Sequence, residues 1–213
     1  MECFLTFAVM VIVILLLVVL SSRRRGIASQ RDTLFEQIAQ RFHGVCRRGG
    51  WLGLPSVRFR YGPTMVLLEI DTVRRGDRRC VTQVHFRWPR SWLRLELTSA
   101  DQTSPADEDP LPLVPLGVRD FDRQFEVRGN DVEAVRKFLS AGVQWHVERL
   151  WRQADKAPVS LSLALGFLSV LKYERFRCFQ DLEDFVRTAV ELFDQAQLTQ
   201  SEVIEFVDEG AVQ

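Results

Sequence analysis

Histidine and cysteine are the residues of this 213-residue chain that could together bind a metal ion. His43 and Cys46 lie three positions apart, and Cys80 and His85 lie five apart, so the two pairs could supply four zinc ligands. Cys80 and His85, however, belong to a segment with strand-like alternation, where an odd separation places them on opposite faces. We therefore expect buried thiols and satisfied or surface histidines, and no metal site.

Two groups of carboxylates could bind a cation or transfer a proton. Glu69 and Asp71 share one face of a predicted strand, but the sequence offers no acid or base partner beside them. Asp181, Glu183 and Asp184 lie at the start of a predicted helix, where the helix dipole alone favours acidic residues. Neither group identifies a reaction.

The sequence lacks the motifs that are typical of nucleotide-binding proteins and hydrolases. The glycine-rich run at 48–53 does not match the phosphate-binding GxxxxGK[ST] loop. Neither GxSxG nor HExxH occurs. The five tryptophans are expected mainly in the core: Trp51, Trp88, Trp92, Trp145 and Trp151. We predict no catalytic residue and no cofactor.

The elements that would position these side chains follow from hydrophobic periodicity. Alternation predicts an antiparallel meander of four strands at 57–61, 65–73, 80–88 and 92–97, and later a strand at 121–128 and a hairpin of 159–165 with 167–173. Helical spacing predicts helices at 31–43, from Asn130 to about Gln153, and from Gln180 onward. Asn130 and Glu133 are expected to form a capping box at the start of the middle helix. The last helix has the clearest apolar stripe: Leu182, Phe185, Val186, Ala189, Val190 and Phe193.

These elements predict an α+β fold, in which a single N-terminal transmembrane helix is followed by an antiparallel sheet packed with amphipathic helices. We expect a transmembrane anchor with a basic flank at 1–25, and a helix plus antiparallel strands at 26–98. An acidic, proline-rich linker at 99–119 precedes a strand–helix–hairpin–helix unit at 120–197. An acidic tail follows at 198–213.

Residues 3–20 form the most apolar stretch of the chain, with one hydroxyl (Thr6) and no charged side chain. A helix of that length spans roughly 27 Å, close to the thickness of a hydrocarbon core. A cleaved secretory signal would have a basic start and a shorter apolar run, whereas here Glu2 precedes the run. The stretch therefore predicts an uncleaved anchor, through which the lipid bilayer is the first partner.

Arg23, Arg24 and Arg25 directly follow the predicted anchor and set its orientation. Flanking arginines remain on the cytoplasmic side and contact lipid headgroups. We therefore expect a single-pass inner-membrane protein, with the globular domain facing the cytoplasm. The domain holds an odd number of cysteines and no CxxC, a pattern that fits a reducing compartment.

The zero net charge conceals a split between the two halves of the chain. Residues 21–100 contain 16 lysines and arginines against 6 acids, a balance of +10, whereas residues 101–213 contain 12 against 21, a balance of −9. The basic half could contact anionic headgroups. Alternatively, the halves neutralise each other or present solvated faces. The arginines alternate along strand-like segments and do not cluster on a reading helix, so nucleic acid is not an expected partner.

Residues 120–195 include the runs FDRQFEVRGNDVEAVRKFLSAGVQWHVERL and VSLSLALGFLSVLKYERFRCFQDLEDFVRTAVELFD. This stretch resembles bacterial domains of unknown function in which a strand, a helix, a hairpin and a terminal helix follow an N-terminal membrane anchor. The resemblance lies in hydrophobic spacing and carries no functional residue. It implies a bacterial, membrane-associated protein.

The sequence thus predicts a membrane-tethered interaction module that binds a protein partner or the anionic membrane surface, and not an enzyme. Tethering would raise its effective concentration for membrane-bound partners. Two alternatives remain open: an anchored enzyme, whose site would be a pocket joining Glu69, Asp71 and His85, and a structural subunit of a membrane complex.

Overall fold

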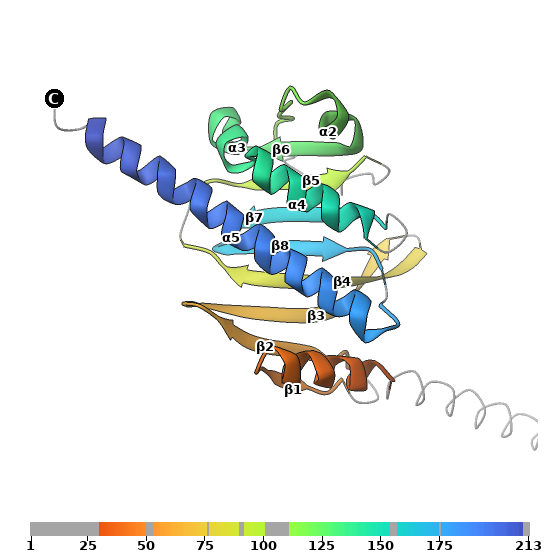
Figure 1. Ribbon diagram of the computed structural model, residues 1–213. Coiled ribbons are helices and arrows are strands. Elements are labelled where there is room, and N and C mark those ends of the chain that lie inside the picture. Colours follow the sequence, from red (N-terminus) through yellow and green to blue (C-terminus); the bar gives the residue numbers. More distant parts are fainter. Residues whose placement is uncertain are drawn as a thin grey trace, which may run out of the picture.

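The structure is a computed structural model that describes residues 30–49, 53–75, 77–89, 92–100, 111–153, 157–174 and 176–210 (Figure 1). Its strands are β1 (Val45–Arg47), β2 (Ser56–Tyr61), β3 (Thr64–Arg75), β4 (Asp77–Arg87), β5 (Leu95–Ser99), β6 (Phe125–Gly129), β7 (Val159–Ala164) and β8 (Phe167–Lys172). Its helices are α2 (Arg119–Gln124), α3 (Val132–Phe138), α4 (Ala141–Arg152) and α5 (Phe179–Gly210), and an earlier helix covers residues 30–41. The predicted α+β class is confirmed.

The eight strands form one antiparallel sheet in the order β1-β2-β3-β4-β8-β7-β5-β6. Strands from both sides of the 99–119 segment therefore share a sheet, because β8 pairs with β4 and β7 pairs with β5. The β7–β8 hairpin agrees with the prediction, and Leu165 and Gly166 at its tip both have positive φ angles. This hairpin joins the two parts of the chain.

One face of the sheet is covered by α4, α5 and the helix at 30–41 (Figure 1). All six predicted stripe residues of α5 are buried, and Phe193 stacks on Phe86 of β4 with ring centroids 4.7 Å apart. Residues that alternate with the buried ones point to the opposite face, such as the half-buried Glu69, Gln83 and His85. The helices and the sheet thus enclose one apolar core.

The predicted meander is wrong in its fourth strand. β2, β3 and β4 follow one another as expected, but β5 begins at Leu95 and pairs with β6 and β7. Pro89 follows β4 and cannot donate a hydrogen bond to a sheet ladder, and β5 lies beyond β8 and β7 in the sheet. The strand next to β4 is instead β8, which no local pattern could reveal.

Two other predicted elements are wrong. Residues 119–124 form the helix α2, so only the second part of the predicted strand at 121–128 is extended. The predicted helix of 130–153 is two helices, α3 and α4, separated at Leu139 and Ser140. The cap of α3 is Asp131, whose side chain accepts from the Ala134 N–H, and not Asn130.

The predicted anchor at 3–20 and its flanking arginines lie outside the described residues. Among the helices that are described, none is both long and apolar enough to cross a membrane. At the other end of the chain, the residues after Leu198 continue the helix α5 to Gly210.

Candidate functional site

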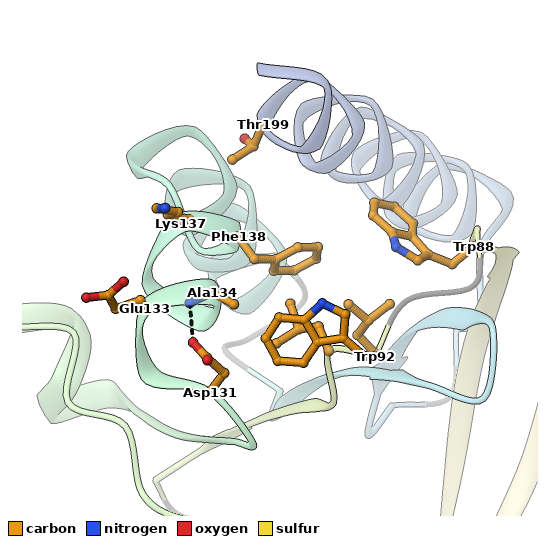
Figure 2. A pocket seen from close by; sticks show the side chains of 10 residues that line it. Trp88, Trp92, Asp131, Glu133, Ala134, Lys137, Phe138 and Thr199 are labelled. Atoms are coloured by element: carbon orange, nitrogen blue, oxygen red, sulfur yellow. Dashed lines mark hydrogen bonds between the residues drawn. The ribbon is translucent and has the colours of Figure 1, made fainter. Parts of the chain in front are cut away.

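A pocket of about 310 Å³ opens where α3, the segment after β4 and the C-terminal part of α5 meet (Figure 2). This volume is at the lower end of the range for ligand pockets, and it suits one or two apolar side chains or a small apolar molecule. The pocket is lined by Trp88, Trp92, Leu93, Asp131, Glu133, Ala134, Lys137, Phe138, Leu163 and Thr199.

Trp88 provides the fixed wall of this pocket. Trp88 is 4% exposed, and its main-chain N–H donates to the Gly166 carbonyl at 2.8 Å. Its ring meets Phe138 and Phe193 edge-on, with centroids 5.8 and 5.6 Å apart. Aromatic contacts of this kind hold a ring in one orientation. The wall therefore exists before any ligand binds.

Trp92 lies at the mouth of the pocket and is 66% exposed. Its carbonyl accepts from Nδ2 of Asn130 at 2.8 Å, and Oδ1 of Asn130 accepts from the Arg94 N–H at 2.9 Å. Asn130, predicted as a helix cap, therefore fixes the segment that presents Trp92. Figure 2 shows the rings of Trp88, Trp92 and Phe138 around one recess. The main chain of Trp92 is thus fixed while its ring is open to solvent, and tryptophan is enriched among the residues that dominate protein–protein binding.

The polar residues of the pocket lie at its rim on α3. Asp131 is occupied as the helix cap, since its Oδ1 accepts from the Ala134 N–H at 2.7 Å. Glu133 and Lys137, one helical turn apart, are exposed, and Figure 2 shows both side chains directed away from the aromatic rings. The recess is thus apolar inside and charged at its edge, so the arrangement suits binding better than catalysis.

Further apolar side chains lie exposed at the same end of the sheet. Leu165 and Phe167, at the tip of the β7–β8 hairpin, are 90% and 48% exposed. The hydrogen bond from Trp88 to Gly166 places this tip against the pocket wall. We call Trp92, Leu165, Phe167 and the pocket together the apolar end. Exposed apolar surface of this kind marks interaction sites.

The open face of the sheet brings together Glu69, His85 and Ser169. Nδ1 of His85 lies 2.7 Å from Oγ of Ser169, and its Nε2 lies 3.4 Å from Oε1 of Glu69. Gln83 donates to the same Glu69 oxygen at 2.7 Å. Glu69 and His85, two of the three residues that the enzyme alternative would join in a pocket, are therefore close together, and Ser169 joins them through the β4–β8 pairing that the sequence did not reveal.

These three side chains resemble the relay of a serine hydrolase, but Ser169 stands in the interior of a strand. Residue 169 pairs with His85 on one side and with Ser162 on the other. The surrounding backbone N–H groups therefore serve the sheet ladder, whereas an acyl-transfer enzyme must aim free N–H donors at the oxyanion. The cluster is best read as a hydrogen-bonded patch on a polar sheet face.

The other residues that the sequence singled out do not converge on a site. Within the described part of the chain, no group of three or more histidine, cysteine or acidic residues could hold a metal ion. Asp181 accepts from the Cys178 thiol at 2.8 Å. Glu183 pairs with Arg41 at 2.8 Å, and Asp184 lies 3.5 Å from Arg187.

A second recess, of about 240 Å³, lies on the outer side of α4 and is lined by Trp145, Arg149, Arg152 and Gln153. The Arg149 guanidinium lies 5.5 Å from the Trp145 ring centroid and donates to Glu191 at 2.5 Å. Burial lowers the pKa of the neighbouring His146. Because Arg149 and Arg152 are already paired with acids, this recess is less suited to a ligand.

Sequence reasoning missed the pocket because its walls come from four separate segments. The sequence feature that could have indicated the pocket is the pair Trp88 and Trp92, which lie on either side of the Pro89-Arg90-Ser91 segment that follows β4. Of the five tryptophans, Trp88 is buried as expected, whereas Trp92 and Trp145 are 66% and 55% exposed.

Comparison with known proteins places the fold but not the site. No protein-family profile and no curated protein matches this chain. One similar solved structure is the crystal structure of the mycobacterial trehalose monomycolate transport factor A, TtfA, with a TM-score of 0.54 and 14% sequence identity. The alignment covers 82% of this chain and 96% of that chain. At this level of identity the two proteins share a fold.

Proposed function

We propose that this chain is a membrane-tethered, non-enzymatic binding module that docks a protein partner at the apolar end. The observation that carries this proposal is the exposed Trp92 beside a preformed apolar pocket. Tryptophan is among the residues that contribute most to protein–protein binding, particularly when its neighbour is a pocket the partner can fill.

The position of the apolar end favours a protein over the bilayer as the ligand. In Figure 1 the helix at 30–41 begins at one end of the sheet, and the β7–β8 tip and the end of β4 lie at the opposite end. If residues 3–20 anchor the chain, the length of the sheet separates the pocket from the end of the domain that follows the anchor. Such an arrangement suits contact with the cytoplasmic part of a membrane-bound partner.

The similar solved structure adds support of a different kind. That protein is a mycobacterial transport factor for trehalose monomycolate. We infer from this shared fold that the present chain serves a membrane-associated transport process as an accessory protein. The pocket would then recognise another component of that process.

Site-specific photo-crosslinking in intact cells tests the proposal. A photoreactive residue replaces Trp92 in the full-length chain, and a second version carries it at Trp145, which is also exposed but lies on α4. We expect one membrane-protein adduct from position 92 and none from position 145. The identified partner is then purified, and its affinity for the unlabelled full-length chain is measured.

In the purified pair, Trp92→Ala should weaken binding by about tenfold or more, as expected for a central aromatic contact. Trp145→Ala should change the affinity less than twofold. Adducts only to lipid, or equal effects of the two substitutions, would overturn the assignment of the apolar end to a protein partner.

A further inference from the structure

The open face of the sheet carries a cluster of arginines beside the apolar end. Phe86 of β4 stacks on α5, so the next residue, Arg87, points to the opposite, open face. In the β4–β8 pairing, Arg87 lies directly opposite Phe167 of the apolar end. On β2, Arg58 and Arg60 alternate with core residues and so point to the same open face. We call these three exposed arginines, Arg58, Arg60 and Arg87, the arginine corner.

Met65 connects the arginine corner to the apolar end. It lies opposite Arg60, and continuation of the β3–β4 register places it beside Arg87. Neighbouring strands lie about 4.8 Å apart, so the main chains of Arg60 and Arg87 flank Met65 at a separation of about 10 Å. Met65 and Phe167 are 50% and 48% exposed. Cationic and apolar side chains therefore alternate along one exposed row across β2, β3, β4 and β8.

The positive charge of the arginine corner is not neutralised by the described part of the chain. No described acid lies within ion-pair distance of its three arginines, and Nε of Arg60 donates to the Gly62 carbonyl at 3.2 Å. Glu69 and Asp71, on the same face of β3, lie four and six residues beyond Met65, which is about 13 and 20 Å along a strand. Unpaired positive charge is therefore concentrated next to the apolar end.

We infer that the partner covers this row with an acidic helix, which presents carboxylates and apolar side chains in alternation. This inference rests on the proposed function and deepens it by naming the chemistry of the partner. The carboxylates pair with Arg60 and Arg87, and the apolar side chains pack on Met65 and Phe167. Arginine suits this role because its guanidinium binds a carboxylate through two parallel hydrogen bonds.

The spacing of the row matches that of a helix. One turn of an α-helix rises about 5.4 Å, close to the distance of about 4.8 Å between neighbouring strands. A helix that lies across the strands thus places successive side chains of one face on successive strands. Like charges would repel a basic helix from the arginine corner, so charge provides specificity while the exposed apolar side chains provide contact area.

An anionic bilayer offers a similar combination of charge and apolar groups, but the position of the row favours a protein. In Figure 1 the turn between β2 and β3 and the start of β8 lie at the end of the sheet opposite to the start of the helix at 30–41. If residues 3–20 anchor the chain, the row lies at the end of the sheet that is remote from the anchor. A membrane-bound partner that already contacts the apolar end reaches this row directly.

Peptide binding to the full-length chain in nanodiscs of zwitterionic phosphatidylcholine tests this inference, with empty nanodiscs as the background. The probe is a fluorescein-labelled, 18-residue, alanine-based helical peptide in which glutamate and leucine alternate from turn to turn along one face. A matched peptide carries lysine in place of every glutamate. Fluorescence anisotropy should show saturable binding of the glutamate peptide, and its affinity should fall as the salt concentration increases.

Two double substitutions locate the binding. Arg60→Gln with Arg87→Gln should weaken binding of the glutamate peptide at least fivefold and should not weaken binding of the lysine peptide. Arg119→Gln with Arg123→Gln is the matched control, because it removes the same charge from two exposed arginines of α2. The control should change the affinity for the glutamate peptide less than twofold. Far-UV circular dichroism verifies that each variant is folded.

The absence of saturable binding of the glutamate peptide, or equal effects of the two double substitutions, would overturn the acidic-helix inference. That failure is distinguishable from failure of the proposed function. Crosslinking from position 92 to a membrane protein does not require Arg60 or Arg87, so it would still occur.

A photoreactive residue in place of Met65 distinguishes a protein from the bilayer in intact cells. We expect an adduct with the same membrane protein that position 92 captures, and we expect this adduct to decrease at least fivefold when Arg60→Gln and Arg87→Gln are introduced. Adducts from position 65 to lipid alone would assign the row to the bilayer and overturn the inference.

Discussion

The ammonium group of Lys172 donates a hydrogen bond to the main-chain carbonyl of Gln153 at 2.6 Å, from a side chain that is completely buried. It also donates to the carbonyl of Leu150. These carbonyls belong to the last turn of α4 and its C-cap, where helical carbonyls lack partners and the helix dipole is negative. A strand of the sheet thus caps a helix through one lysine.

Lys172→Met should therefore destabilise the protein, because it leaves two carbonyls without their donor. Each buried unsatisfied group costs about 1–3 kcal/mol, and the removal of a desolvated charge offsets part of this. We expect a net loss of about 2 kcal/mol at pH 7 by chemical denaturation. An unchanged unfolding midpoint would show that water replaces the lysine.

The same lysine should make stability depend on pH in the alkaline range. Burial lowers the pKa of Lys172 from 10.5 to about 8. The unfolded chain therefore binds more protons than the folded chain between these values, so this group adds stability as pH rises from 8 to 10.5. Wild type should gain about 1–2 kcal/mol over Lys172→Met between pH 7 and pH 9.5. A constant difference would place the folded pKa near its ordinary value.

The two tryptophans of the pocket should separate stability from binding. Trp88 is buried against Phe138 and Phe193, so Trp88→Ala should cost about 3–5 kcal/mol. Trp92 is mostly exposed, so Trp92→Ala should change stability by about 0.5 kcal/mol or less. Thermal unfolding of both variants tests this contrast. A large loss in Trp92→Ala would mean that this ring supports the fold and is a poor probe of binding.

Glu183 joins the helix at 30–41 to α5 through Arg41, and a second arginine, Arg187, lies 3.2 Å from the same oxygen. The hydrogen bond from Arg41 is the main cause that lowers the pKa of Glu183 below 4.5. Because the pKa of Glu183 is lower in the folded protein than in the unfolded chain, its carboxylate stabilises the fold at pH values above the unfolded pKa. This stabilisation is lost as the pH falls through the folded pKa. Glu183→Gln should cost about 1 kcal/mol at pH 7.

The difference in unfolding free energy between wild type and Glu183→Gln should shrink as the pH falls below 4.5, because the Glu183 carboxylate of wild type is then protonated and neutral. Urea unfolding of both proteins at pH 7 and at successively lower pH measures it. Asp184→Asn is the control, since Asp184 is more exposed and lies 3.5 Å from Arg187. Equal losses in the two variants would contradict a special role for Glu183.

The sequence predicted structure best where the apolar periodicity depends only on the helix or strand that carries it. The stripe from Leu182 to Phe193 requires only a regular helix and an apolar neighbour, and all its members are buried. Alternation in 57–61 and 65–73 likewise requires only a sheet with two different faces, and both segments are strands of the expected hairpin.

Long-range pairing and competing local signals explain what the sequence did not reveal. The neighbour of β4 is β8, about 85 residues further along the chain, and periodicity carries no information about such partners. Phe121 and Phe125, four residues apart, fit both a strand and a helix; they pack together at 4.7 Å where α2 ends and β6 begins. The pocket depends on these same pairings, so its residues could not be grouped from sequence.

The cluster of Ser169, His85 and Glu69 allows a direct test of the non-enzymatic proposal. A reactive serine would displace fluoride from a fluorophosphonate probe and form a stable phosphonate ester. We expect no labelling of the full-length chain, because the N–H groups around Ser169 serve the sheet ladder. Labelling that disappears in both Ser169→Ala and His85→Ala, but not in Ser162→Ala, would establish a nucleophile and favour the enzyme alternative.

Arg23, Arg24 and Arg25 determine which side of the membrane the pocket faces, if residues 3–20 form the proposed anchor. Since arginines that flank a span remain in the cytoplasm, protease added to whole cells should leave the domain intact, and protease added to inverted vesicles should cut it. Replacing all three arginines with glutamate should invert or mix this pattern. Replacing them with lysine, which retains the charge, should preserve it. An unchanged pattern in the glutamate variant would mean that another feature orients the chain.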